Sequence, residues 1–170
     1  MFGEIIEGEM QNHPFGEIVQ ACWQELPNHY SHLKLGTFVV MPNHIHGILH
    51  LIESELLSAD FVGAGLRPAS TGDGILPVRR GVSEILRALK SFSSRWINEF
   101  RGTPGVAVWQ RNYYERIIRD EEALSRIQKY ILTNPLRWWC NRENPAADSA
   151  DDFDRWLETQ GENPIRRGRL

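Results

Sequence analysis

Residues 41–51, MPNHIHGILHL, are the stretch of this 170-residue sequence that decides the fold. Short apolar runs flank two closely spaced histidines, and turn-forming residues come directly before them. We therefore expect a strand over 44–52, joined by a hairpin-like connection to a strand over 33–40. Alternate side chains of a strand leave the same face, so His44 and His46 should point together toward one small target, most simply a divalent metal.

A His-x-His pair alone is a weak signal for a metal site. The alternative interpretation is two half-exposed imidazoles on the surface of a sheet. His50 shares the strand face of His46 but lies too far along it to bind the same metal. The remaining histidines have no partnered spacing and are expected on the surface: His13, His29 and His32. A second group of reactive side chains is needed to choose between these interpretations.

The rest of the chain predicts an antiparallel α+β fold. Apolar residues recur at helical spacing in some segments and alternate or cluster as in strands in others. The order of predicted elements is that of a ferredoxin-like sheet with helices on one face. The elements are a strand within 2–10, a helix over 16–26 ended by Pro27, strands over 33–40 and 44–52, a helix over 83–100, a strand within 106–118 and a helix over 120–133 that stops near Asn134 and Pro135.

The chain length suits one compact domain, which we place at 1–138. Within it, periodicity fades over 53–80, where glycine and other turn formers gather, so this segment is expected to be a flexible surface insertion. Residues 139–170 are interpreted as a C-terminal tail with an acidic segment and a basic end.

The composition is that of an ordinary globular protein, with 41% hydrophobic and 24% charged residues. No apolar run approaches membrane length and the first residues do not resemble a signal peptide, so we expect a cytoplasmic protein without membrane contact. Cys22 and Cys140 lack the spacing of a zinc site and are expected to be reduced thiols.

The net charge of −3 hides an uneven distribution of charge. Residues 1–60 contain one basic and eight acidic residues, whereas residues 77–137 contain twelve basic and six acidic ones. A basic region with interleaved aromatic residues is typical of a surface that binds a phosphate backbone. Ordinary solvated helix charge is the alternative interpretation.

The second group of reactive side chains lies on the last predicted helix. Tyr130 and Asn134 are four residues apart and therefore project from the same face. A phenol, whose ordinary pKa is about 10, attacks phosphorus readily only when a cation polarises the phosphate. If His44, His46 and the amide oxygen of Asn134 hold Mg²⁺ or Mn²⁺, the metal can polarise a phosphate beside Tyr130. The reaction expected is transesterification, which leaves the 5′ phosphate of a cut DNA strand on the tyrosine.

Three segments together resemble the REP-associated tyrosine transposases, relatives of insertion-sequence transposases of the IS200 type with one catalytic tyrosine and an HUH motif. The segments are PNHIHGI at 42–48, WQRNYYERIIR at 109–119 and YILTNP at 130–135. The resemblance covers roughly 2–138 and is interrupted at 53–80. It implies a ferredoxin-like fold and a metal-dependent endonuclease and strand transferase, acting on single-stranded DNA with palindromic hairpins such as REP elements, as a monomer or homodimer.

By motif match, the resemblance implies that His44 and His46 are metal ligands, that Tyr130 is the nucleophile and that Asn134 is the third ligand. It also implies a strand before Phe2, which we expect this chain to lack. Such a loss would expose neighbouring strand edges, so a non-catalytic protein that only binds DNA hairpins is the alternative function.

Other residues are secondary candidates. Tyr113 and Tyr114 are alternative nucleophiles, or strand aromatics that pack on the core or stack on bases. Trp138 and Trp139 either stack on bases or pack on the sheet. Charge and position along the chain suggest six DNA contacts, with packing or helix surface charge as the alternative: Arg87, Lys90, Arg95, Trp109, Arg111 and Arg116.

Overall fold

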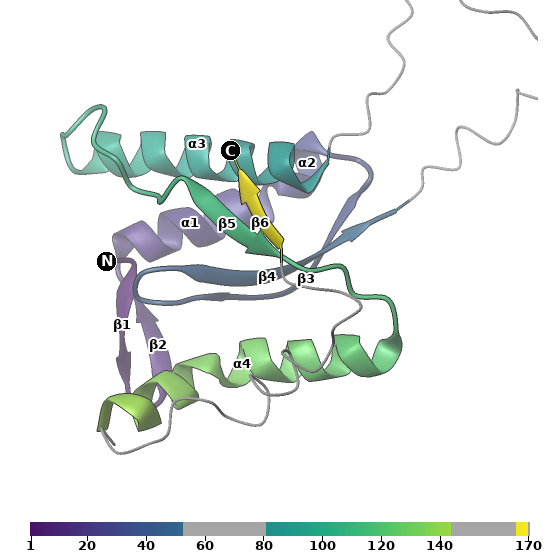
Figure 1. Ribbon diagram of the computed structural model, residues 1–170. Helices are drawn as coiled ribbons and strands as arrows, with labels where there is room; N and C mark the ends of the chain where they lie inside the picture. The colour runs from purple at the N-terminus through teal and green to yellow at the C-terminus, as the bar shows by residue number, and fades with distance from the viewer. Residues whose placement is uncertain (53–80, 144–165, 170) are drawn as a thin grey trace, which may run out of the picture.

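The computed structural model describes residues 1–52, 81–143 and 166–169, and the predicted insertion at 53–80 lies outside them. The fold is α+β with small antiparallel sheets and is compatible with a ferredoxin-like arrangement, which confirms the predicted class (Figure 1). No described helix is both long and apolar enough to cross a membrane. The elements are β1 (Gly3–Ile6), β2 (Glu9–Asn12), α1 (Pro14–Gln24), α2 (Leu26–His29), β3 (Leu33–Val40), β4 (Ile45–Leu51), α3 (Val82–Phe100), β5 (Asn112–Glu115), α4 (Glu121–Glu143) and β6 (Arg166–Arg169).

The central element is the antiparallel hairpin of β3 and β4, and both strands were predicted. Its register pairs Val39 with His46 and Phe38 with Gly47. Directly paired residues share a face of the sheet, and neighbours along a strand lie on opposite faces. His46 and Gly47 therefore face opposite sides of the hairpin.

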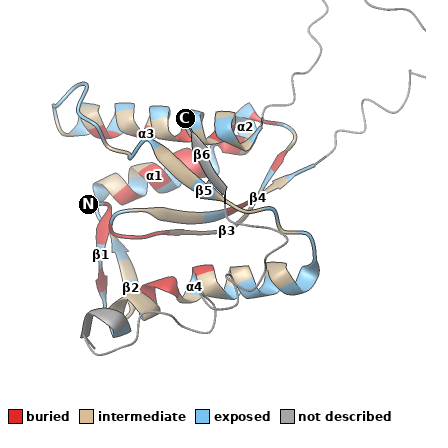
Figure 2. Ribbon diagram, viewed as in Figure 1, coloured by how far each residue is buried: buried red, intermediate tan, exposed pale blue. Residues whose placement is uncertain are grey.

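Helices lie on both faces of this hairpin (Figure 1). On one face, Trp23 of α1 stacks on Phe38 with ring centroids 4.3 Å apart, and a Cβ at Gly47 would lie 2.5 Å from the Trp23 ring. α3 packs on α1 and contributes Ile85 and Leu89 to the same buried cluster, drawn in red in Figure 2. α4 contacts the other face, so the expectation of helices on one face holds for α1 and α3 and not for α4.

The first predicted strand is instead a hairpin of two short strands, β1 and β2. Glu7 and Gly8 form the turn with φ values of 52° and 83°. Two successive positive φ values are typical of the tight turns that match strand twist, but a glutamate at the first position is an unusual signal for one. The Phe2 amide donates to the Pro42 carbonyl at 2.8 Å, which attaches this segment to the connection before His44.

The predicted end of the last helix at Asn134 and Pro135 is wrong, because α4 continues through Pro135 to Glu143. Proline removes one backbone hydrogen bond from a helix interior, but Pro135 and Ile131, one turn before it, are both buried, and this burial offsets that cost. The predicted start is confirmed by the Asp120 side chain, which accepts a hydrogen bond from the Ala123 amide at 2.7 Å. The proposed domain boundary at 138 therefore falls inside a helix.

The other differences from the predicted elements are local. The first helix ends at Gln24, and Pro27 lies in the first turn of α2 rather than ending a helix. The strand expected within 106–118 is only β5, which pairs with β6 in a segment expected to be part of the tail. The carbonyls of Gln110 and Asn112 accept hydrogen bonds from the Lys90 ammonium, so this part of the chain is held by α3.

Ser93 of α3 offers a test of how the segment before β5 is held. Its buried hydroxyl accepts a hydrogen bond from the Trp109 indole at 2.9 Å and donates one to the Leu89 carbonyl. Ser93→Ala leaves the indole N–H without this partner, so we expect the free energy of unfolding to fall by about 1–3 kcal/mol.

Urea unfolding of Ser93→Ala beside Ser91→Ala measures this cost. Ser91 is an exposed serine of the same helix, and its substitution should change the free energy of unfolding by less than about 0.5 kcal/mol. Equal effects of the two substitutions would contradict a structural role for the Trp109 to Ser93 hydrogen bond.

Candidate active site

The two histidines meet at the start of β4. Their Nε2 atoms are 3.0 Å apart and their ring centroids 4.7 Å apart, with the rings nearly perpendicular. The connection that places them is short and fixed, because the fully buried Met41 donates its amide to the His44 carbonyl at 2.8 Å. The predicted convergence of His44 and His46 on one point is therefore confirmed.

Asn43 orients the first imidazole. Its side-chain oxygen lies 2.6 Å from Nδ1 of His44. An amide oxygen only accepts hydrogen bonds, so Nδ1 carries the proton and the neutral ring presents an Nε2 lone pair toward His46. This is the arrangement by which a neighbouring acceptor selects the tautomer of a metal-binding histidine.

Burial keeps both imidazoles neutral. Desolvation lowers the pKa of His44, and it lowers the pKa of His46 to about 4, with smaller contributions from the charges of His44 and Arg137. At neutral pH both rings are therefore uncharged, which is the form that binds a metal ion.

α4 brings the predicted nucleophile to this pair. The ring of Tyr130 meets that of His46 edge to face, with centroids 5.6 Å apart at 82°. Asn134 lies one turn further along the same face of α4 and is buried, with 8% of its surface exposed. The alternative tyrosines are elsewhere: Tyr113 and Tyr114 lie on β5, and Tyr114 is 75% exposed.

The later part of α4 adds two side chains to the site, Arg137, which the sequence analysis did not single out, and Trp138, which it considered as a base-stacking residue. The Arg137 guanidinium lies over the Tyr130 ring, 4.6 Å from its centroid, and the Trp138 ring lies 6.0 Å from that of His44. Arg137 follows Tyr130 by two helical turns, which is a usable signal only if the helix continues. Because the helix was predicted to end at Asn134, Arg137 was not expected near Tyr130.

The spacing of the histidine nitrogens fits a shared metal ion. Two nitrogens each about 2.1 Å from a metal and about 90° apart around it would be separated by roughly 3.0 Å. Their Nε2 separation of 3.0 Å matches this right-angled arrangement, which is typical of octahedral Mg²⁺ or Mn²⁺. Within the described ranges no cluster of three His, Cys, Asp or Glu side chains could hold a metal, so a third side-chain ligand from these ranges would have to be of another type, such as the Asn134 amide.

Two residues that were predicted to contact DNA, Lys90 and Trp109, make contacts within the protein instead. The Lys90 ammonium donates to two backbone carbonyls, and burial lowers its pKa. Trp109 packs on Phe2 with ring centroids 4.8 Å apart while its indole nitrogen bonds to Ser93. Arg116 is half-buried.

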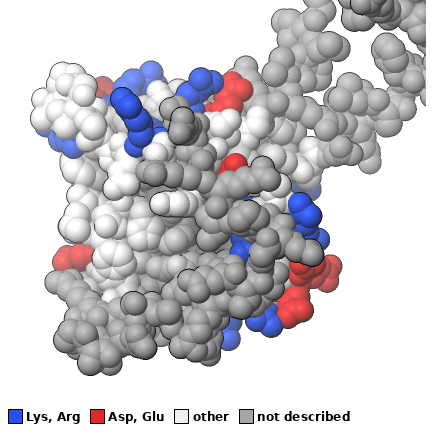
Figure 3. All heavy atoms as spheres, in the orientation of Figure 1, with Lys and Arg blue, Asp and Glu red and all other residues white. Residues whose placement is uncertain are grey.

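The other predicted DNA contacts are exposed. Arg87 forms a long ion pair of 3.8 Å with Glu84, Arg95 lies near the Phe92 ring, and Arg111 precedes β5. On the face shown in Figure 3, basic side chains gather over α3, and basic and acidic ones mix near the start of α4. Their exposure leaves these three arginines accessible to solvent.

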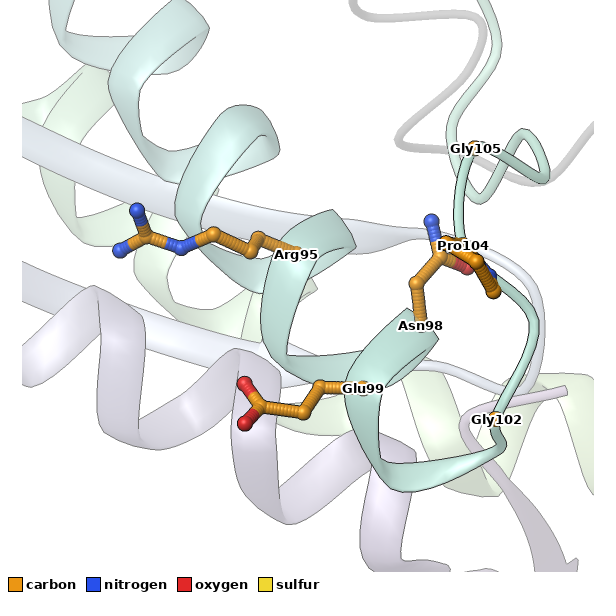
Figure 4. Close-up of a pocket in the computed structure, with 6 residues that line it drawn as sticks. All are labelled: Arg95, Asn98, Glu99, Gly102, Pro104 and Gly105. Atoms are coloured by element: carbon orange, nitrogen blue, oxygen red, sulfur yellow. The ribbon is translucent and has the colours of Figure 1, made fainter.

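A hollow of about 520 Å³ lies at the end of α3, lined by Arg95, Asn98, Glu99, Gly102, Pro104 and Gly105 (Figure 4). It is not the histidine site, because α3 and α4 cover opposite faces of the hairpin. Asn98 uses its amide to bond the Val106 carbonyl and so holds the adjacent loop. We therefore place the candidate chemistry at the histidine pair.

The burial of His46 predicts how stability depends on pH. In metal-free protein, the unfolded chain binds a proton at His46 below its ordinary pKa of 6.5, whereas the folded chain binds it only near pH 4. The free energy of unfolding should therefore fall as the pH decreases from about 6.5 to about 4. Urea unfolding in the presence of a chelator measures this, and His46→Gln should reduce the dependence. An NMR titration midpoint for His46 at or above 6.5 would contradict the burial of its ring.

Comparison with known proteins gives a family but no activity. No protein-family model matches the chain, and no solved structure matches it. An uncharacterized protein of Haemophilus influenzae is 36% identical over 142 residues, which cover 81% of this chain and 74% of that protein. This chain therefore belongs to the same family as the uncharacterized Haemophilus influenzae protein.

Proposed function

We propose that the protein is a metal-dependent endonuclease and strand transferase, which acts on single-stranded DNA with palindromic hairpins through a covalent 5′-phosphotyrosine. The contact between His46 and Tyr130 is the observation that carries the proposal. It joins a pair of neutral, convergent imidazoles to a potential nucleophile from a distant part of the sequence. The resemblance of the same segments to tyrosine transposases supports the choice of DNA as substrate.

Tyr130 would perform the covalent step. Its phenol oxygen forms a bond to the phosphorus as the bond from phosphorus to the 3′ oxygen breaks. The phenol proton passes to solvent, and the departing 3′ oxygen takes up a proton from water. In strand transfer the reaction runs backward, with the 3′ hydroxyl of another strand displacing the tyrosine.

His44, His46 and the side-chain oxygen of Asn134 would hold Mg²⁺ or Mn²⁺, and the separation of the histidine nitrogens supports this assignment. A metal bound there supplies charge that polarises the scissile phosphate. The chain itself contributes preorganisation, because Asn43 fixes the His44 tautomer and burial keeps both imidazoles neutral. The Arg137 guanidinium beside Tyr130 adds positive charge where a phosphate would lie.

The nucleophile can be tested by covalent trapping. The full chain is incubated with a labelled DNA hairpin carrying single-stranded flanks in Mn²⁺, and the products are separated on a denaturing gel. We expect a DNA adduct from the unaltered chain and none from Tyr130→Phe, which lacks the attacking oxygen.

Tyr114→Phe is the matched control, since it removes an exposed tyrosine hydroxyl of β5 and should leave the adduct intact. An adduct that survives Tyr130→Phe would show that the nucleophile is another residue. If the unaltered chain binds the hairpin but forms no adduct in Mg²⁺ or Mn²⁺, the non-catalytic binding function is correct instead.

Metal binding can be tested without activity. A ligand that binds the folded chain alone raises its melting temperature, by an amount that grows with ligand concentration. We expect Mn²⁺ to raise the melting temperature of the unaltered chain and EDTA to reverse the rise. His46→Gln should lose most of it. A similar rise in the melting temperature of His46→Gln would show that the metal binds elsewhere. His50→Gln, a substitution on the same strand, is the control and should keep the rise.

A further inference from the structure

Trp138 lies beside the candidate active site because α4 is continuous through Pro135. Its ring centroid is 6.0 Å from that of His44, and the planes are tilted by 43°. At this tilt the two rings are not stacked in parallel, so His44 does not cover the indole face to face. The side chain is half-buried and keeps part of its surface open to solvent.

Arg137, the residue before Trp138, places a positive charge beside Tyr130 in the same candidate site. The Arg137 guanidinium is 4.6 Å from the centre of the Tyr130 ring. A phosphate near Tyr130 would therefore meet a positive charge, with an indole beside it next to His44. Adjacent positive charge and an aromatic ring are the two elements of sites that bind single-stranded nucleic acid.

We propose that Trp138 stacks on the nucleobase next to the scissile phosphate and so forms a nucleotide subsite, with Arg137 contacting the phosphate. This inference rests on the proposed function. It makes Trp138 a substrate-binding residue, whereas Trp139 projects from α4 about 100° further round the helix. Stacking tolerates any base, so the subsite positions the strand without reading its sequence.

Equilibrium binding separates the subsite from catalysis. The full chain is titrated in EDTA against a fluorescein-labelled DNA hairpin with single-stranded flanks, and anisotropy gives the affinity. Trp138→Leu keeps an apolar side chain but removes the aromatic face, and we expect it to weaken binding on the order of ten-fold. Trp138→Phe should recover most of the affinity, and Trp139→Leu should change it less than about two-fold.

Abasic nucleotides placed in turn along the flanks identify the stacked base. At one position the abasic substitution should weaken binding by the unaltered chain and have no further effect on Trp138→Leu, as a double-mutant cycle requires. Thermal unfolding confirms that each variant is folded. If Trp138→Leu fails to fold, Trp138→Met, which also removes the aromatic face, replaces it in the cycle.

The outcomes distinguish the subsite from the proposed function. Equal affinities of Trp138→Leu, Trp139→Leu and the unaltered chain would overturn the subsite and leave the nuclease proposal standing. Selective weakening by Trp138→Leu in a chain that forms no covalent adduct would support the subsite and overturn the nuclease. A chain that binds no DNA hairpin overturns both.

Discussion

The register between β3 and β4 is the constraint on which the rest of the structure depends. Pairing Val39 with His46 directs the imidazole to the face covered by α4 and places Gly47 on the face covered by Trp23. A slip of one residue would exchange the two faces. It would bury the imidazole against α1 and bring a side chain into conflict with the Trp23 ring. The packing that stabilises the hairpin and the geometry of the histidines are therefore set together.

α4 is the second determinant of the site, because this one helix brings four side chains to the histidine pair or its surroundings. Tyr130, Asn134, Arg137 and Trp138 occupy three successive turns, and a helix fixes their relative positions more tightly than separate loops would. Ile131 and Pro135 are buried on this helix and hold it against the rest of the fold. The position of the Tyr130 ring relative to His46 thus depends on burial along α4.

Sequence patterns predicted the elements with strong apolar periodicity and missed those set by tertiary contacts. The strand at 33–40 and the helix α3 were predicted closely, since each has a continuous apolar face. The β1–β2 turn at Glu7 and the passage of α4 through Pro135 contradict local preferences and are stabilised by packing. The histidine pair was predicted from strand alternation alone. The structural use of Lys90 could not be predicted, because it depends on what another segment places nearby. Arg137 was missed because the helix that carries it beside Tyr130 was predicted to end at Asn134.

The electrostatics of the site favour a cation and an anion bound together. Desolvation is the main cause of the lowered pKa of His46, and the positive charge of Arg137 lowers it further because it disfavours a second charge nearby. The same repulsion would act on a metal ion if the imidazoles held one, as proposed. In the proposed reaction a DNA phosphate lies between these charges and offsets the repulsion, since it carries the negative charge that the described site residues lack. Metal and DNA would then each strengthen the binding of the other, and by linkage the two effects must be equal.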